Sequence, residues 1–364
     1  MGYLPLEELA KLDTIEVGDY ETAVEEIYRL GWTDGLPVIL PTPRLVQNIL
    51  DYLGRDPQQV IGIIPPYRGA ATVEKIAVNC VMAGCLPEYV PVVLTALTAM
   101  LKERFNLNGV QATTHCATPL LIVSGPVVER LGFNSRDNAF GGGSRANATV
   151  GRAIRLILWN IGGGRAGELD KAVLGHPGKW SYCIAEEKEW NPWTPLHTDR
   201  GFDSVESCAT VFAGEAPHHI MTGGGYSSPD KILTVLADSM ATVGNSTMQA
   251  GGDMVLVIGP LVAKHLAAKG YSKSDIRDAL IERTRKPVAL MNANEYLGEG
   301  HPFHFSRFTD PRDAEASVPL IRRPENLLIV VAGGWGSGSG ICGFIPGWGR
   351  HGGFAETERI DFPS

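Results

Sequence analysis

Two short apolar segments that each end in Gly-Pro constrain the fold of this chain more than any other feature. Residues 119–126 read PLLIVSGP and residues 254–260 read MVLVIGP. Strands that are apolar on both sides are typical of sheets whose two faces are covered. Segments with helical periodicity lie between such strands, so the sequence predicts an α/β fold with mostly parallel sheets and helices on both faces.

The likeness of these segments also predicts an internal duplication. A strand that leads into prolines at 60–66 has a counterpart at 209–217. We therefore expect duplicated β-α-β-α units in a pseudo-twofold arrangement. The expected parts are an N-terminal helical arm with a Pro-rich segment at 1–58, a first α/β repeat with a Gly-rich loop at 59–174, an aromatic connecting loop at 175–206, a second α/β repeat at 207–300, and a C-terminal strand with a Gly-rich tail at 301–364.

The connecting loop is dense in aromatic residues, histidines and glutamates. Loops of this length in compact domains are often lids or binding loops, and the alternative is a strap that buries its tryptophans. The adjacent carboxylates Glu186 and Glu187 are expected to form a solvated run rather than an acid–base pair.

The composition is that of a globular protein. The chain has 364 residues, 44% of them hydrophobic, and a formal net charge of -8, which disfavours nucleic acid or an anionic membrane as a partner. It lacks a signal-peptide pattern and an apolar stretch of about 18 residues, so we expect a cytoplasmic protein. The six cysteines include no C-x-x-C pair, which favours free thiols over a disulfide framework.

A glycine run at 141–143 leads into a segment whose apolar residues recur at helical spacing. A glycine loop that feeds a helix N-terminus can hold an anion, because the first N–H groups of the helix are unpaired. The alternative is a long turn capped by Asn147 with arginines on a solvated face. The residues expected to bind substrate, here and at the end of the apolar strand at 327–334, are Gly142, Gly143, Arg145, Asn147, Arg152, Gly333 and Gly334.

Cys85 is the cysteine that best fits a catalytic nucleophile. It lies between Gly84, where one helix should end, and Pro87, where the next should begin, and the positive end of a helix lowers the pKa of a thiol. The alternative is a small buried residue at a helix–helix corner. His115 is the expected general base, and Cys116 is a second candidate thiol.

A metal site is the rival interpretation. His218 and His219 are adjacent, and His301 and His304 lie close together after a glutamate. Imidazoles with a carboxylate are a usual ligand set for zinc or iron, but Pro302 prevents a regular helix from placing the second pair on one face. We therefore expect no cofactor, with a divalent zinc or iron ion as the alternative.

Four phrases of the sequence carry a resemblance to a known family. They are DGLPVILPTP, ATVEKIAVNCVMAGCLPEY, RANATVGRAIRLIL and WTPLH. Together they resemble an uncharacterised bacterial family associated with UGSC selenoproteins, small proteins with a selenocysteine-Gly-Ser-Cys motif, over most of residues 30–290. This chain has no C-G-S-C of its own. The resemblance implies thiol or selenol chemistry shared with a small UGSC-type partner, and it implies no particular reaction.

Three functions remain open on these observations. The first is a lyase, hydrolase or thiol-dependent oxidoreductase that cleaves or forms a carbon–heteroatom bond in a small anionic molecule through Cys85. The second is a metal-dependent hydrolase or lyase that uses the four histidines. The third is a non-catalytic subunit of a two-protein system, whose duplicated halves clamp a ligand. We expect a homo-oligomer.

Overall fold

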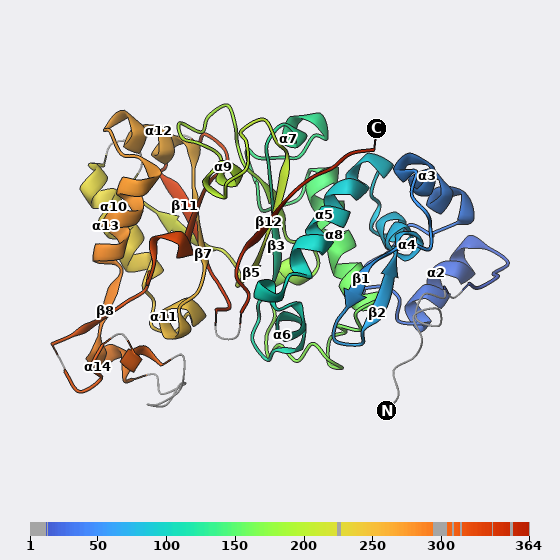
Figure 1. The fold of residues 1–364 in the computed structure, drawn as a ribbon, viewed down its shortest axis with the longest axis horizontal. Helices are drawn as coiled ribbons and strands as arrows, with labels where there is room; N and C mark the ends of the chain where they lie inside the picture. Colours follow the sequence, from blue (N-terminus) through green and yellow to red (C-terminus); the bar gives the residue numbers. More distant parts are fainter. Residues whose placement is uncertain are drawn as a thin grey trace.

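The centre of the molecule is a pair of four-stranded sheets (Figure 1). The computed structural model describes residues 12, 14–223, 227–293, 304–307, 309–313, 315–336, 338–349 and 352–363. The first sheet has the order β12-β5-β3-β4, with β3 (Thr118–Ser124), β4 (Cys183–Ala185), β5 (Cys208–Gly214) and β12 (Glu356–Arg359). The second has the order β10-β7-β11-β6, with β6 (His218–Met221), β7 (Met254–Ile258), β10 (Leu327–Val331) and β11 (Ile341–Pro346).

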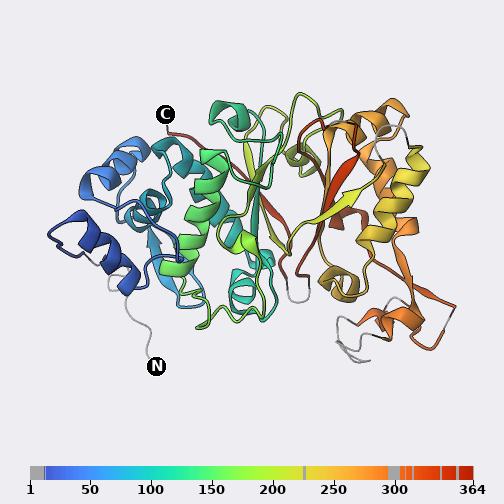
Figure 2. The same cartoon turned by 180° about the vertical axis from the view of Figure 1, so that it is seen from behind.

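The two sheets pack face to face and carry helices on their outer sides. Alternate residues of both sheets, such as Leu120 and Val255, form the layer between them. Their neighbours, such as Leu121 and Leu256, pack under helices instead. The outer helices are α5 (Val90–Met100) and α8 (Arg145–Asn160), with α3 (Pro43–Leu53) and α4 (Val73–Ala83) beyond them, on one side and α10 (Pro229–Met240), α12 (Pro260–Ala268) and α13 (Lys273–Arg283) on the other. The fold therefore has four layers, α-β-β-α (Figures 1 and 2).

This arrangement corrects two expectations of the sequence analysis. The sheets are mixed rather than mostly parallel, because only β3–β4 and β7–β10 run parallel while the other pairings in both sheets are antiparallel. Helices cover only one face of each sheet, since the other face packs on the second sheet. An apolar strand reads the same in sequence whether a helix or another sheet covers it, so the pattern could not separate the two cases.

The chain crosses from one sheet to the other twice. After β5 it enters the edge strand β6 of the second sheet, and after β11 it enters the edge strand β12 of the first. The two crossings meet at an antiparallel bridge between Gly214 and Gly347. The segment at 60–66, expected to match 209–217, instead forms β1 (Val60–Ile64), which pairs with β2 (Gly69–Thr72) in a separate ribbon.

The remaining elements are short or peripheral. They are α2 (Tyr20–Arg29), α6 (Leu107–Ala112), α7 (Val127–Arg130), α9 (Leu196–Asp199), α11 (Ser246–Ala250), β8 (Arg285–Pro287), α14 (Val288–Met291) and β9 (Ser317–Pro319). Over the described ranges, no single helix is long and apolar enough to cross a membrane. The helices at 73–83 and 87–100 reach that length only together, are bent by 119° relative to each other, and supply much of the buried core.

Candidate functional site

A groove of about 520 Å³ lies where β7 and β10 end and β11 begins. Its walls come from both halves of the molecule, because the loop before α8 contributes residues 137–140 and the segment after β5 contributes Pro217 and His219. The other lining residues are Val257, Gly259, Ala332, Gly333, Gly334, Gly336, Ile341, Cys342 and Gly343. The carboxyl ends of parallel strands are the usual place for a ligand in α/β folds.

The predicted residues Gly333 and Gly334 therefore line this groove. Gly333 has a φ of +110°, and its N–H donates to the carbonyl of Ser135 at 2.8 Å. A Cβ on Gly334 would lie 1.8 Å from Oδ1 of Asp137. The two glycines thus let the 134–143 loop of one half approach the strand end of the other.

A group of titratable residues lies at the opposite end of the first sheet. The register pairs Thr118 of β3 with Gly214 of β5, so residues just before β3 and just after β5 come together. We name this group the Glu215 cluster; its members are His115, Cys116, Asp170, His176, Lys179, Tyr182 and Glu215.

Hydrogen bonds fix the orientation of the Glu215 carboxylate. His115 Nε2 lies 3.0 Å from Glu215 Oε1, and the Ser246 N–H donates to the same oxygen at 3.0 Å. His115 Nδ1 accepts from the N–H of Ala117 at 3.2 Å, so the ring carries its proton on Nε2 and donates it to Glu215. The two contacts to the carboxylate both involve Oε1 and leave Oε2 outside them.

Cys116 is the one cysteine of the six that is not buried. Burial of its sulfur raises the pKa of the Cys116 thiol, the negative charge of Glu215 raises that pKa further, and the ammonium of Lys179 lowers it. The side chain is therefore a protonated thiol at neutral pH, with a carboxylate and a cation beside it.

The connecting segment supplies the other members of the cluster. Lys179 Nζ contacts Asp170 Oδ2 at 2.6 Å, and Arg155 from α8 lies 3.8 Å from the same oxygen. Burial lowers the pKa of His176 to about 4, so this imidazole is neutral at physiological pH. The Tyr182 hydroxyl donates to the backbone carbonyl of Glu215 at 2.9 Å. The sequence analysis did not select these residues, because their partners are distant in the chain.

The Glu215 cluster and the groove approach each other at two places. Pro217 of the groove wall follows Glu215 by two residues, and the ring of Phe140, another wall residue, lies 6.3 Å from the ring of Tyr182. The members of the cluster themselves lie outside the lining of the groove.

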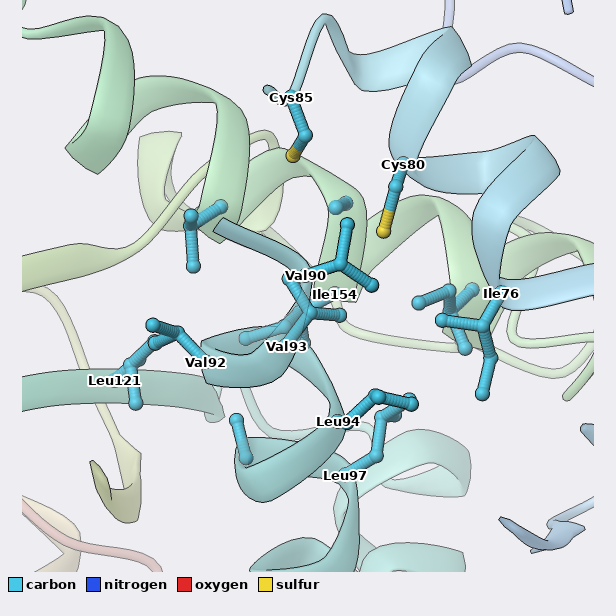
Figure 3. Packing of buried hydrophobic residues seen from close by; sticks show 14 of the residues in the cluster. Ile76, Cys80, Cys85, Val90, Val92, Val93, Leu94, Leu97, Leu121 and Ile154 are labelled. Carbon is cyan, nitrogen blue, oxygen red and sulfur yellow. The ribbon is translucent and has the colours of Figure 1, made fainter. Parts of the chain in front are cut away.

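Cys85 lies elsewhere, in the apolar core between α4, α5 and α8 (Figure 3). Its side chain is 8% exposed, and its Sγ donates to the carbonyl of Thr149 at 3.3 Å. His115 bonds instead to Glu215 at the other end of the first sheet, so the structure does not bring Cys85 and His115 together. The surroundings of Cys85 are those of a packed residue at a helix–helix corner.

The polar residues at the start of α8 have partners within the chain. Ser144 caps the helix by accepting from the N–H of Asn147, and the buried Asn147 side chain bonds to both backbone groups of Asn134. Arg145 donates two hydrogen bonds to the carbonyl of Gly84. These contacts attach the 134–143 loop and the end of α4 to the helix. Gly142 and Gly143, also expected to bind substrate, are exposed in that loop.

Arg152 forms a bidentate ion pair with Asp34, at 2.7 and 3.0 Å, and donates to the carbonyls of Leu36 and Pro37. Its side chain is 15% exposed. The guanidinium therefore holds the turn after Asp34 against α8. Arg152 is neither a solvated surface arginine nor a group that is free to bind an anion.

The candidate metal ligands are dispersed where they are described. His218 and His219 are successive residues of β6 and lie opposite Phe344 and Gly343, so their side chains point to opposite faces. His304 Nδ1 accepts from the N–H of Ser306, while His301 lies outside the described residues. Within the described residues, no group of three or more His, Cys, Asp or Glu side chains could hold a metal ion.

The expectation that Glu186 and Glu187 form a solvated run is wrong. The two residues are 3% and 2% exposed, because they continue β4 into the space between the sheets. Glu187 accepts from Ser135 Oγ at 2.6 Å and from Arg136 Nε at 3.1 Å. Burial raises the pKa of Glu186 to about 7. Partners such as Ser135 and Arg136 are distant in sequence, and a local charge count cannot reveal them.

The protein is therefore a four-layer α-β-β-α protein with a groove at the strand ends of the second sheet and a separate thiol–carboxylate–ammonium group. No protein-family model and no curated protein matches the sequence of this chain.

Proposed function

We propose that this protein is an enzyme that cleaves or forms a carbon–heteroatom bond in a small anionic organic molecule through the thiol of Cys116. The observation that supports this most is the placement of Cys116 near the carboxylate of Glu215 and the ammonium of Lys179. We assign the reactive thiol to Cys116 rather than to Cys85, because Cys85 is packed in the core.

Glu215 is suited to accept the proton of the thiol. Its Oε1 is held by His115 and Ser246, while Oε2 has none of these bonds. In the proposed step, the Cys116 thiol transfers its proton to Oε2, the sulfur attacks the substrate carbon, and the carbon–heteroatom bond breaks. The leaving heteroatom then takes the proton back from Glu215, and Lys179 stabilises the transient thiolate. In a second step, water attacks the same carbon and gives a proton to Glu215, the carbon–sulfur bond breaks, and Glu215 returns the proton to the Cys116 sulfur.

An anionic substrate is supported by one feature of the site. Lys179, which is paired with Asp170, places a cation in the cluster. No observation on the described residues favours the metal-dependent alternative.

We also infer that the two halves are related by a pseudo-twofold duplication. The order β4-β3-β5-β12 repeats the pairing types of β10-β7-β11-β6, namely one parallel pair followed by two antiparallel pairs. The similar segments at 119–126 and 254–260 contain β3 and β7, which hold equivalent places in that order.

We further propose that the protein is cytoplasmic, forms a homo-oligomer and acts with a small UGSC-type partner that carries a thiol or selenol.

The function is tested by turnover of a panel of small carboxylates that carry a carbon–sulfur, carbon–oxygen or carbon–halogen bond. Cys116→Ser and Glu215→Gln are expected to lower kcat/KM by about 100-fold or more, because each removes a reacting group. Cys85→Ser is the matched control and is expected to keep the activity. Unchanged turnover in Cys116→Ser, with circular dichroism like that of the wild type, contradicts the proposal.

Glu215→Gln is also expected to speed the alkylation of Cys116 by iodoacetamide at pH 8. The charge of Glu215 raises the pKa of the thiol, so its removal increases the thiolate fraction. Mass spectrometry of the Cys116 peptide over time measures the rate. Glu325→Gln, which removes an exposed carboxylate, is expected to leave the rate unchanged, and an equal or slower rate in Glu215→Gln contradicts the placement of the two groups.

A further inference from the structure

The end of α4 brings two thiols together that the proposed reaction does not use. Cys80 lies in the last turn of the helix, and Cys85 is the first residue beyond its cap, Gly84. On a continuous helix, side chains five residues apart point in different directions. The sequence alone therefore does not predict that these sulfurs meet.

The end of the helix at Gly84 lets the two side chains point the same way. Gly84 is left-handed, with a φ of +91°, and the N–H of Cys85 donates to the carbonyl of Cys80 at 2.9 Å. The N–H of Gly84 bonds to the carbonyl of Val81. This pair of bonds is the Schellman motif, in which the residue after the glycine folds back onto the third residue from the helix end. Those two contact positions are here Cys85 and Cys80.

The side chains agree with the backbone geometry. The Cys85 thiol beside it, together with burial, raises the pKa of the Cys80 thiol, and Figure 3 shows both sulfurs on the same side of the turn, above Val90 and Ile154. Cys80 is 0% exposed and Cys85 is 8% exposed. A small oxidant therefore reaches Cys85 first, with Cys80 in place as the second thiol.

We propose that Cys80 and Cys85 form a redox-active pair that a peroxide oxidises to an intramolecular disulfide. The Cys85 sulfur attacks a peroxide oxygen, which gives a sulfenic acid and releases water or an alcohol. The Cys80 sulfur then attacks the Cys85 sulfur, which forms the disulfide and releases water. The two thiols lose two electrons and two protons in total, and the peroxide is the acceptor.

The disulfide would act on the start of α8. Cys85 Sγ donates to the carbonyl of Thr149, and the neighbouring Gly84 carbonyl accepts both hydrogen bonds of Arg145. Oxidation removes the thiol proton and with it the bond to Thr149. The first turns of α8 hold the 134–143 loop, which forms part of the groove wall. Oxidation of this pair is therefore expected to change the position of that loop and with it the shape of the groove.

The test is peptide mass spectrometry of the full-length protein after treatment with hydrogen peroxide and then iodoacetamide, without reductant. Trypsin releases residues 76–102 as one peptide that contains both cysteines and no other. The expected product is two hydrogens lighter than the reduced peptide, takes up no iodoacetamide, and returns to the reduced mass with dithiothreitol.

Two variants separate this pair from its buried neighbour Cys183, whose pKa is raised by burial and, to a smaller extent, by the charge of Cys85. Cys183→Ala is expected to form the same product, and Cys80→Ala is expected to stop at a sulfenic acid on Cys85 that dimedone traps. A peptide 76–102 that keeps two alkylatable thiols while Cys116 is oxidised overturns the proposal. So does a disulfide between Cys85 and Cys183.

Discussion

Asp34→Ala is expected to lower the free energy of unfolding by about 3 kcal/mol, because it leaves the guanidinium of Arg152 largely buried without its counter-charge. The pair is bidentate, and the two side chains are 6% and 15% exposed. Urea denaturation followed by circular dichroism measures the change. Asp361→Ala removes one of the two carboxylate partners of the exposed Arg359 and is expected to change stability by no more than about 0.5 kcal/mol.

The pH dependence of the Asp34 variant provides a second measurement. Burial acts to raise the pKa of Asp34, but the hydrogen bonds and charge of Arg152 outweigh it and hold this pKa below its ordinary value of 3.8. A lowered carboxyl pKa stabilises the folded state above the unfolded pKa, and that stabilisation is lost as the pH falls through the folded pKa. The difference in the free energy of unfolding between the wild type and Asp34→Ala should therefore become smaller below pH 3.8. A midpoint in urea that does not move at pH 7 contradicts a structural role for Arg152.

Glu186→Gln is expected to remove a stability loss of about 2.5 kcal/mol that the wild type suffers between pH 5 and pH 8. Burial raises the pKa of Glu186 from 4.5 to about 7. A raised carboxyl pKa favours folding at low pH, and this advantage is lost as the pH rises from the unfolded to the folded value, because the buried group must then ionise. Glutamine keeps an acceptor for the N–H of Leu196, which donates to Glu186 at 2.7 Å.

Urea midpoints at pH 5, 6, 7 and 8 measure this difference. Glu325→Gln changes an exposed carboxyl and is expected to follow the wild type at every pH. If the free energies of unfolding of the wild type and Glu186→Gln change with pH in the same way, the carboxyl of Glu186 is ionised throughout this range. That result contradicts the raised pKa.

The class of the fold and the position of several elements could be predicted from the sequence. Apolar runs located β3, β7 and β10. These signals are local, because they depend on residues within one turn or one strand. The pairing of two sheets through their apolar faces is not local, so the sheets were expected to carry helices on both sides.

The candidate site was predictable only in part, for the same reason. His115 and Cys116 were selected from their residue types, and Gly333 and Gly334 from their position at a strand end. Glu215 joins His115 only through the antiparallel register of β3 and β5, 100 residues apart. Arginines and an asparagine beside a glycine run suggested an anion site, whereas tertiary contacts give Arg145, Asn147 and Arg152 partners within the protein.

The exchange of edge strands between the sheets also limits how the protein can fold during synthesis. The first sheet is completed by β12, whose residues 356–359 pair with β5 at 208–211. A ribosome must therefore translate the whole second half before the first sheet gains its last strand. Until then β5 presents an open edge, which is a site for pairing with another nascent chain.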